Sequence, residues 1–451
     1  TKFDILGSTQ LPLPSLQEAP CSMRKVDPQL AAIRQAAKER FLAQKAAAPP
    51  ADAAPSLPAV LAHLPPEKLD APIGSLLADA PPEFTRPVKR PRTDPDVFVV
   101  PKERTAEIRA LLAKPPPEDL RVLTWNIDGL DEVGGGPALS KRALAVAKEV
   151  AEKRPAAVFL QEVVPPALEL LAAPQILGTE YEILVPKNPP LPYYVAILLD
   201  RKRLVKLGET VTVSFPSTQM GRQLLTIAVE LKEKPKAGAL LLATAHLEST
   251  KDHAVERKRQ LTQSLRYLQK AVGKPPAGVP GAPPIAAAMF GGDLNIRDEE
   301  VKAVHKEMGE DAKGLADVWS FCGFPEADRW TWDTTANTNI GATFSCKTRF
   351  DRILFISPGI SDAKGCPSLA APKAKAAAKP QEHPNDRWRP TRIELVGKSK
   401  VTDLGRFPSD HWGVLTFWED GPAKPLFPSG ERKTILPVAA SKGGAVIDLD
   451  S

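Results

Sequence analysis

Polar side chains that could do chemistry recur in this sequence at the ends of short apolar runs. They are Asn126 and Asp128 after VLTW, Gln161 and Glu162 after VFL, Asp293 and Asn295 after AAMFGG, and Asp410 and His411 before WGVLTF. Gathered at one edge of a sheet, they would form a pocket of carboxylates, amides and one imidazole. Such oxygen donors suit a hard divalent cation beside a phosphate, whereas zinc is disfavoured because the sequence has no clustered thiols or histidines.

Each of these groups alone is typical of a turn or a helix cap. Six groups, however, occur in a fixed order, each at a strand end: WNxDG, QE, HLES, GDLN, FDR and SDH. Agreement of all six by chance is very improbable, so the combination favours a functional site.

The apolar runs that would position these residues are typical of β-strands. They are rich in Val, Ile, Leu and aromatic residues and are bounded by Pro, Gly, Asn or Asp, as in RVLTWNIDGL, AAVFLQEV, AAAMFGGDLN and HWGVLTFW. Two long helices are expected, over Leu139–Lys153 and Asp252–Val272. This pattern predicts an α/β (α+β) fold, a four-layer sandwich in which two mixed β-sheets pack face to face between helices.

Composition predicts a folded domain between two tails. Twenty of the 48 prolines fall in the first 118 residues, which hold too few bulky apolar residues to offset the entropy lost on ordering. We expect a disordered Pro/Ala-rich tail over 1–118 with one short helix at Asp27–Ala48, a catalytic domain over 119–420 and a disordered tail over 421–451. Two surface insertions are expected, at Gly273–Pro284 and Ser361–Arg387.

The overall composition excludes several classes of protein. No apolar run approaches the ~18–20 residues of a membrane span, which excludes an integral membrane protein. The four cysteines form no CxxC pair, which excludes a disulfide framework or a zinc finger and fits a reducing compartment. The formal net charge of +6 is a mild bias toward anionic partners.

The ordered motifs resemble the endonuclease/exonuclease/phosphatase superfamily, and within it the 5′-tyrosyl-DNA phosphodiesterases. The segments that carry the resemblance are TWNIDGLD (124–131), FLQEVVPP (159–166), FPSTQMGR (215–222), HLEST (246–250), TWDT (331–334), CKTRFDRI (346–353) and GRFPSDHWG (405–413). The resemblance implies Mg²⁺-dependent hydrolysis, with Mn²⁺ as a substitute, of the bond between tyrosine and a DNA 5′-phosphate. The implied substrates are trapped type II topoisomerase adducts on single-stranded 5′ DNA ends, the product is a 5′-phosphate for double-strand break repair, and the implied enzyme is a monomer.

The resemblance also implies a role for individual residues. Glu162 and Asp128 would bind the metal, and Asn126 and His411 would contact the phosphate. Asp293 would act as the base, aided by Asn295, and Asp351 would orient His411. The implied DNA- and substrate-binding residues are Asn126, Ile127, Asp128, Gly129, Leu130, Tyr193, Arg222, His246, Leu247, Glu248, Ser249, Thr250, Lys251, Asn295, Ile296, Arg297, Trp332, Phe350 and His411.

Two segments in the expected tails resemble targeting or interaction signals. RPVKRPR at 86–92 is a basic, proline-rich stretch that predicts nuclear import and a nuclear location. AVIDLDS at 445–451 interleaves apolar and acidic residues and resembles a SUMO-interacting motif, with Val446–Leu449 adding as a strand to a sheet edge.

Two other functions stay open on the sequence. One is another phosphoesterase of the same fold, such as an abasic endonuclease, an RNA-directed nuclease or a phosphoinositide phosphatase. The other is a non-enzymatic adaptor, which the presence of Asn126, Glu162, Asp293 and His411 argues against.

Overall fold

The computed structural model describes residues 100–312, 314–357 and 388–420. The helices are α4 (Lys102–Ala113), α5 (Gly135–Lys153), α6 (Pro165–Ala172), α7 (Ala254–Ala271), α8 (Asp298–Met308) and α9 (Val318–Phe321). The strands are β1 (Leu120–Asn126), β2 (Ala157–Val163), β3 (Tyr181–Leu184), β4 (Tyr194–Asp200), β5 (Leu204–Lys206), β6 (Val211–Ser214), β7 (Gln223–Leu231), β8 (Ala239–Ala245), β9 (Ile285–Asp293), β10 (Leu315–Asp317), β11 (Trp332–Asp333), β12 (Lys347–Thr348), β13 (Asp351–Ile356), β14 (Trp388–Val396) and β15 (Gly413–Asp420).

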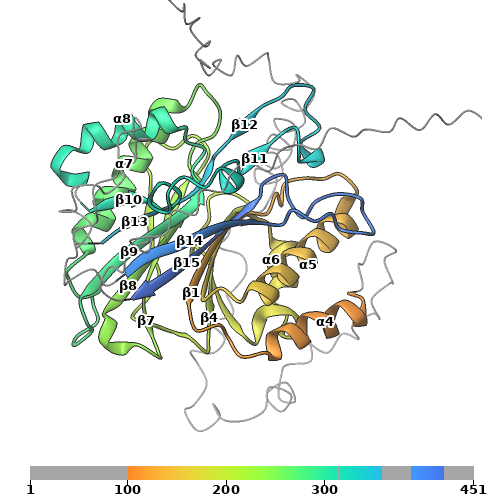
Figure 1. The fold of residues 1–451 in the computed structure, drawn as a ribbon, viewed down its shortest axis with the longest axis horizontal. Coiled ribbons are helices and arrows are strands. Elements are labelled where there is room, and N and C mark those ends of the chain that lie inside the picture. The colour runs from red at the N-terminus through yellow and green to blue at the C-terminus, as the bar shows by residue number, and fades with distance from the viewer. Residues whose placement is uncertain (1–99, 313, 358–387, 421–451) are drawn as a thin grey trace, which may run out of the picture. The chain divides into compact units, whose positions relative to one another are not determined.

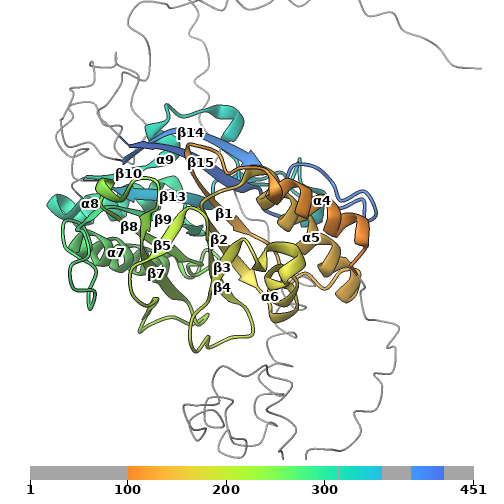
Figure 2. The same cartoon turned by 90° about the horizontal axis from the view of Figure 1, so that it is seen from below.

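All of these strands except β11 and β12, which pair with each other, form two mixed sheets that helices cover on their outer faces. One sheet has the order β14-β15-β1-β2-β4-β3, and the other has the order β10-β13-β9-β8-β7-β5 with β6 beside β7. Figures 1 and 2 show α4, α5 and α6 on the side of the first sheet and α7 and α8 on the side of the second. The predicted four-layer α/β sandwich is therefore confirmed.

Alternation of side chains along each strand explains how one strand contributes to two hydrophobic cores. In β1, Val122 points between the sheets, whereas Leu123 and Trp125 pack under α5. In β9, Met289 lies between the sheets and Phe290 lies with the side chains of α7 and α8. Because successive strand residues face opposite sides, a nearly continuous apolar run can line two cores at once.

The sheet topology brings the polar strand ends to one edge. β1 runs parallel to β2, and β8 runs parallel to β9, so the carboxyl ends of each pair meet. β13 and β15 run antiparallel to β9 and β1, so their amino ends lie at the same edge. Asp351, the first residue of β13, pairs directly with Asp293, the last residue of β9.

Ordered structure begins before the predicted domain boundary at residue 119. Helix α4 lies at 102–113, within the expected tail, and its Ile108 and Leu112 are buried in the core shared with α5. This part of the prediction was wrong because two apolar side chains suffice to anchor a short helix whose sequence is otherwise polar. Among the described residues, no helix is long and apolar enough to cross a membrane.

Most predicted elements are present within the described residues. The two long helices correspond to α5 and α7, and Gly273–Pro284 is a loop between α7 and β9. The segment 358–387, which contains all of the second expected insertion, lies outside the described residues. The same holds for the helix at Asp27–Ala48, the basic segment at 86–92 and the segment at 445–451.

Candidate active site

Three strand ends converge on the amide of Asn126. Its Nδ2 donates to Glu162 Oε1 at 3.2 Å and to Asp293 Oδ2 at 3.0 Å, and its Oδ1 accepts from the backbone N–H of Asp128 at 2.9 Å. This last bond fixes which way the amide faces, because only the NH₂ side remains for the two carboxylates. One amide therefore joins the residues predicted to bind metal to the predicted base.

The backbone is strained where it presents the two predicted metal ligands. Asp128 and Glu162 have φ values of 51° and 53°, a conformation that side chains other than glycine rarely adopt. At Glu162 the pairing of β2 with β4 shifts register between Leu160 and Val163, so the strand bulges there. Gly129 donates to the Glu162 carbonyl, and a Cβ at Gly129 would lie 2.2 Å from that oxygen. Glycine is therefore required in the WNIDGLD loop.

Two glycines bring Asp293 to its position. A Cβ at Gly291 would lie 2.6 Å from the Phe159 ring of the other sheet, and a Cβ at Gly292 would lie 2.0 Å from the Ala245 carbonyl. Asp293 Oδ1 then accepts from the backbone N–H of Asn295, whose own φ is 50°. The GGDLN turn is thus built for close approach of the two sheets next to Asp293.

His411 is held from several sides. Its Nδ1 lies 2.8 Å from Asp351 Oδ2, its backbone N–H donates to Ser409 Oγ, and its carbonyl accepts from the Trp125 indole. Its Nε2 faces Asp293 Oδ2 at 3.8 Å. The predicted pairing of Asp351 with His411 is present, and it aims the other ring nitrogen into the site.

Burial and neighbouring charges shift the pKa values of both groups. Burial raises the pKa of Asp293 to about 6; Asp351 adds to this, while His411 and the Asn126 amide act against it. Burial alone would lower the pKa of His411, but the carboxylates of Asp351, Asp410 and Asp293 outweigh it and hold that pKa well above 6.5. The pKa of Asp293 is thus shifted toward neutral pH, whereas that of His411 is shifted so that the imidazole keeps its proton.

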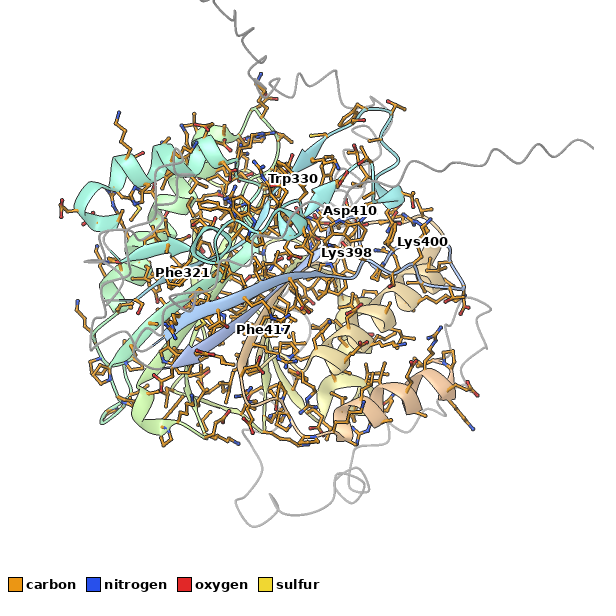
Figure 3. All side chains as sticks on the ribbon, in the orientation of Figure 1. Phe321, Trp330, Lys398, Lys400, Asp410 and Phe417 are labelled. Carbon is orange, nitrogen blue, oxygen red and sulfur yellow. The ribbon has the colours of Figure 1, made fainter. Side chains whose placement is uncertain are left out.

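A cluster of carboxylates beside this pair fits a hard cation. Burial first, and then the charges of Asp410 and Glu162, raise the pKa of Asp128, while the Arg142 guanidinium opposes this. Like charges gathered in a buried site are stabilised by a divalent cation with oxygen ligands, so the donor set fits such an ion. Asp410, which Figure 3 labels, lies in the segment between β14 and β15 and directly precedes His411.

His246, the first residue of HLEST, lies beside the same oxygen of Asp293 that His411 faces. Its Nε2 is 3.3 Å from Asp293 Oδ2, and its Nδ1 is 3.1 Å from Arg222 Nη1. A guanidinium only donates, so Nδ1 must accept and the ring proton sits on Nε2, facing Asp293. Arg222 also lies over the Tyr193 ring, 5.5 Å from its centroid. Tyr193, Arg222 and His246 line a pocket together with Pro186, Pro190 and Met220.

The predicted groove residues divide into groups. Trp332 and Phe350 are half-buried neighbours with ring centroids 5.9 Å apart, and Arg297 lies 5.8 Å from the Phe350 centroid. Leu130, two residues after Asp128, is 45% exposed and available for contact. We call Trp332, Phe350 and Arg297 the groove wall. Tyr193 is not part of it, because its ring packs against Arg222.

Among the residues implied to bind DNA, four have buried side chains outside the polar centre. Ile127, Leu247 and Ile296 lie in the hydrophobic cores, and Glu248 is fully buried. Their predicted role in binding DNA stays a prediction, and in this arrangement it would rest on their backbone groups. Ser249, Thr250 and Lys251, which follow in the same segment, are not buried.

Glu248 has a structural task in this arrangement. Its Oε1 accepts from Thr218 Oγ1 and the backbone N–H of Gln219, both at 2.7 Å, and from Met220 N at 3.1 Å. The carboxylate therefore fixes the loop that carries Arg222 into the site. An acidic residue between Leu247 and Ser249 gave no sequence signal for this role.

Other residues that support the site were not assigned a role from the sequence. Thr331 Oγ1 accepts from the backbone N–H groups of Phe350 and Asp351, and the Thr331 carbonyl accepts from Trp412 N. Gln161 donates to Thr124 and Thr244, which lie on different sheets. The TWDT and QE motifs contained these residues, but their partners are distant in sequence, so a role could not be deduced.

Comparison with known proteins agrees with this geometry. Residues 123–411 match the model of the Endonuclease/Exonuclease/phosphatase family. Tyrosyl-DNA phosphodiesterase 2 of Xenopus tropicalis is 36% identical over 323 residues, 72% of this chain and 72% of that protein. The protein of the same name from Homo sapiens is 38% identical over 294 residues, 65% of this chain and 66% of that protein.

Solved structures give the same result. The crystal structure of D. rerio TDP2 complexed with a single-strand DNA product has a TM-score of 0.52 and 31% sequence identity, covering 67% of this chain and 100% of that chain. A truncated Caenorhabditis elegans TDP2 has a TM-score of 0.51 and 28% identity, covering 68% of this chain and 100% of that chain.

Proposed function

Because this chain belongs to the endonuclease/exonuclease/phosphatase family and is a phosphodiesterase hydrolase, we propose that it is a Mg²⁺-dependent 5′-tyrosyl-DNA phosphodiesterase. The observation that carries the proposal is the position of Asp293, which contacts Asn126 at 3.0 Å and His246 at 3.3 Å beside the carboxylates of Glu162 and Asp128. The names of the relatives and the single-strand DNA product bound to one of them support the choice of substrate.

Asp293 acts as the general base in this proposal. With a pKa of about 6, it is largely ionised at neutral pH yet basic enough to accept a proton from water. Asn295 orients the carboxylate through Oδ1, and Asn126 orients it through Oδ2.

Asn126 and His411 stabilise the charge that develops on the phosphate. The Asn126 NH₂ group lies between the carboxylates of Glu162 and Asp293, and the His411 Nε2 faces the same Asp293 oxygen. With its raised pKa, His411 favours the protonated form and donates toward a phosphate oxygen, and Asn126 would join it by turning one of its two N–H groups away from a carboxylate. Removing one such donor typically costs ~10²–10³ in rate.

Glu162 and Asp128 would hold the cation, which supplies Lewis-acid stabilisation of phosphate charge when bound. The leaving group needs little assistance, because a tyrosine phenol has a reference pKa of ~10, far below that of a sugar hydroxyl. Trp332 and Phe350 would stack on unpaired bases without reading their sequence, which suits a single-stranded 5′ end.

The cellular substrate in this proposal is a type II topoisomerase trapped on DNA through its tyrosine, with a 5′-phosphate left for break repair. Another phosphoesterase activity of the same fold is the alternative. The pocket of Tyr193, Arg222 and His246 next to Asp293 favours the tyrosyl substrate, since it offers an aromatic and a cationic side chain beside the base.

The test is release of tyrosine from a 5′-phosphotyrosyl oligonucleotide by the full chain, with Mg²⁺ and with chelator. An abasic duplex and a phosphoinositide serve as competing substrates, and Asp293→Asn prepared in parallel controls for contaminating nucleases. We expect fast, Mg²⁺-dependent release of tyrosine. Preferential cleavage of the abasic duplex or the phosphoinositide would refute the proposal.

A further inference from the structure

Arg142, on the first half of α5, occupies an unusual position behind the site. Its side chain is 1% exposed, and its guanidinium donates to four backbone carbonyls. Nη1 donates to Ile127 and Pro408, both at 3.3 Å, and Nη2 donates to Asp128 at 3.0 Å and Asp131 at 3.3 Å.

These carbonyls belong to two segments far apart in the sequence. Residues 127–131 follow β1 and include Asp128. Pro408 lies in the segment that continues through Ser409 to His411. A single side chain thus cross-links the segment of a predicted metal ligand to the segment of the predicted phosphate ligand. Ser409 adds one further link, because its Oγ donates to the Asn126 carbonyl at 2.6 Å.

Two carboxylates complete the arrangement. Arg142 lies 3.6 Å from Asp128 Oδ2 and 3.5 Å from Asp131 Oδ2. Arg406 reaches the same Asp131 oxygen from the surface side at 2.7 Å. The loop after β1 is therefore held between a buried and a partly exposed arginine.

We propose that Arg142 is a positioning residue that keeps Asp128 and His411 at the separation needed for a cation and the scissile phosphate to be bound together. This inference rests on the proposed function. Its physical basis is the planar guanidinium, which offers several donors in fixed directions, whereas the lysine ammonium presents its donors from a single point. Charge alone does not supply this link.

Arg154, at the other end of the same helix, is a natural control. It is also buried, and it donates to the Leu112 carbonyl and to Asp200 at 3.0 and 3.1 Å. These partners join α4 to the far end of β4, away from the strand ends that form the site. Arg154→Lys therefore removes a comparable buried arginine without touching the loop after β1.

The experiment compares Arg142→Lys with Arg154→Lys in the full chain. Thermal unfolding is followed at increasing Mg²⁺ without substrate, since a bound cation raises the melting temperature. In Arg142→Lys we expect ~10–100-fold more Mg²⁺ to be needed for half of the stabilisation, the usual effect of losing a group that orients a metal ligand. Arg154→Lys melts lower but keeps the wild-type response to Mg²⁺.

Turnover provides the second measurement. In Arg142→Lys, saturating Mg²⁺ does not restore kcat, because the His411 segment is displaced as well. A wild-type Mg²⁺ response in Arg142→Lys would refute the proposal, since charge alone would then suffice. If Arg142→Lys does not fold, Asp131→Asn takes its place, with a several-fold rise in the Mg²⁺ requirement expected and an unchanged requirement contradicting the proposal.

The thermal measurement needs no substrate. Failure of the wild-type chain to release tyrosine would therefore refute the proposed function without deciding the role of Arg142. A normal Mg²⁺ response in the variant would refute the role of Arg142 alone.

Discussion

The catalytic centre and the groove wall are held in different ways. In the centre, His411 has its ring, its N–H and its carbonyl each bonded to a separate buried residue. On the wall, Trp332 lies in β11, a two-residue strand, and its ring meets Phe350 at 5.9 Å without a hydrogen bond. Chemistry requires donors fixed to a fraction of an ångström, whereas stacking on bases tolerates adjustment. Substitutions in the centre should therefore lower kcat, and substitutions on the wall should raise KM.

The largest effect is expected at the base. Asp293→Asn should lower the single-turnover rate by ~10² or more, because the proton acceptor is lost while the Asn126 contact can be kept. DNA affinity, measured by fluorescence anisotropy, should stay close to wild type. If binding weakened while the single-turnover rate was unchanged, Asp293 would belong to binding and the contrast between the two regions would fail.

A similar loss is expected at the predicted metal ligand, but with a different signature. Glu162→Gln keeps the shape of the side chain and removes its charge, so turnover should fall by ~10²–10³ and more Mg²⁺ should be needed. A titration of rate against Mg²⁺ measures both effects. Near-normal activity at low Mg²⁺ would show that Glu162 does not bind the metal directly.

The wall should respond more weakly and in KM. Trp332→Ala removes one stacking surface, worth ~1–3 kcal/mol per base, so KM for a single-stranded substrate should rise roughly tenfold. The matched control is Phe324→Ala, because the Phe324 ring packs against Trp319 rather than against Trp332 or Phe350. A loss confined to kcat in Trp332→Ala would mean that the wall also orients the phosphate.

The ion network beneath the wall should affect stability more than activity. Burial acts to raise the pKa of Asp298, but Arg352 and Arg349 outweigh it and hold that pKa well below 3.8. Charged Asp298 therefore stabilises the fold above about pH 4, and this contribution is lost as the pH falls below that value. Asp298→Asn should melt several degrees lower at pH 7, and the difference from wild type should shrink in acid. A difference independent of pH would exclude the ion pairs as its cause.

The smallest effect on purified enzyme is expected from the segment at 86–92. Changing Lys89, Arg90 and Arg92 to Ala should leave the rate of tyrosine release unchanged, because every residue assigned to chemistry lies elsewhere. In cells, we expect the same variant to leave the nucleus, as fluorescence microscopy of a tagged chain would show. A large loss of activity in solution would mean that the segment contributes to the site.

Much of the fold could be predicted because its signals are local. The runs that became β1, β2, β9 and β15 carry their strand pattern within a few residues, and each has at or next to one of its ends the polar residue that the site uses. The resemblance to a known family then assigned roles to those residues. Helix α4 was not predicted because its helical stretch is short, polar and flanked by prolines.

The sequence by itself determined which chemical groups are present and which strand ends carry them, because both follow from residues that are neighbours in the chain. Only the tertiary structure decided that Glu248 is buried beneath a loop rather than facing a substrate, and that Arg142 joins residues 127–131 to Pro408. A charged side chain in a sequence looks the same whether it will be solvated or buried. Its burial depends on partners brought from distant segments, and those partners exist only once the sheets have packed.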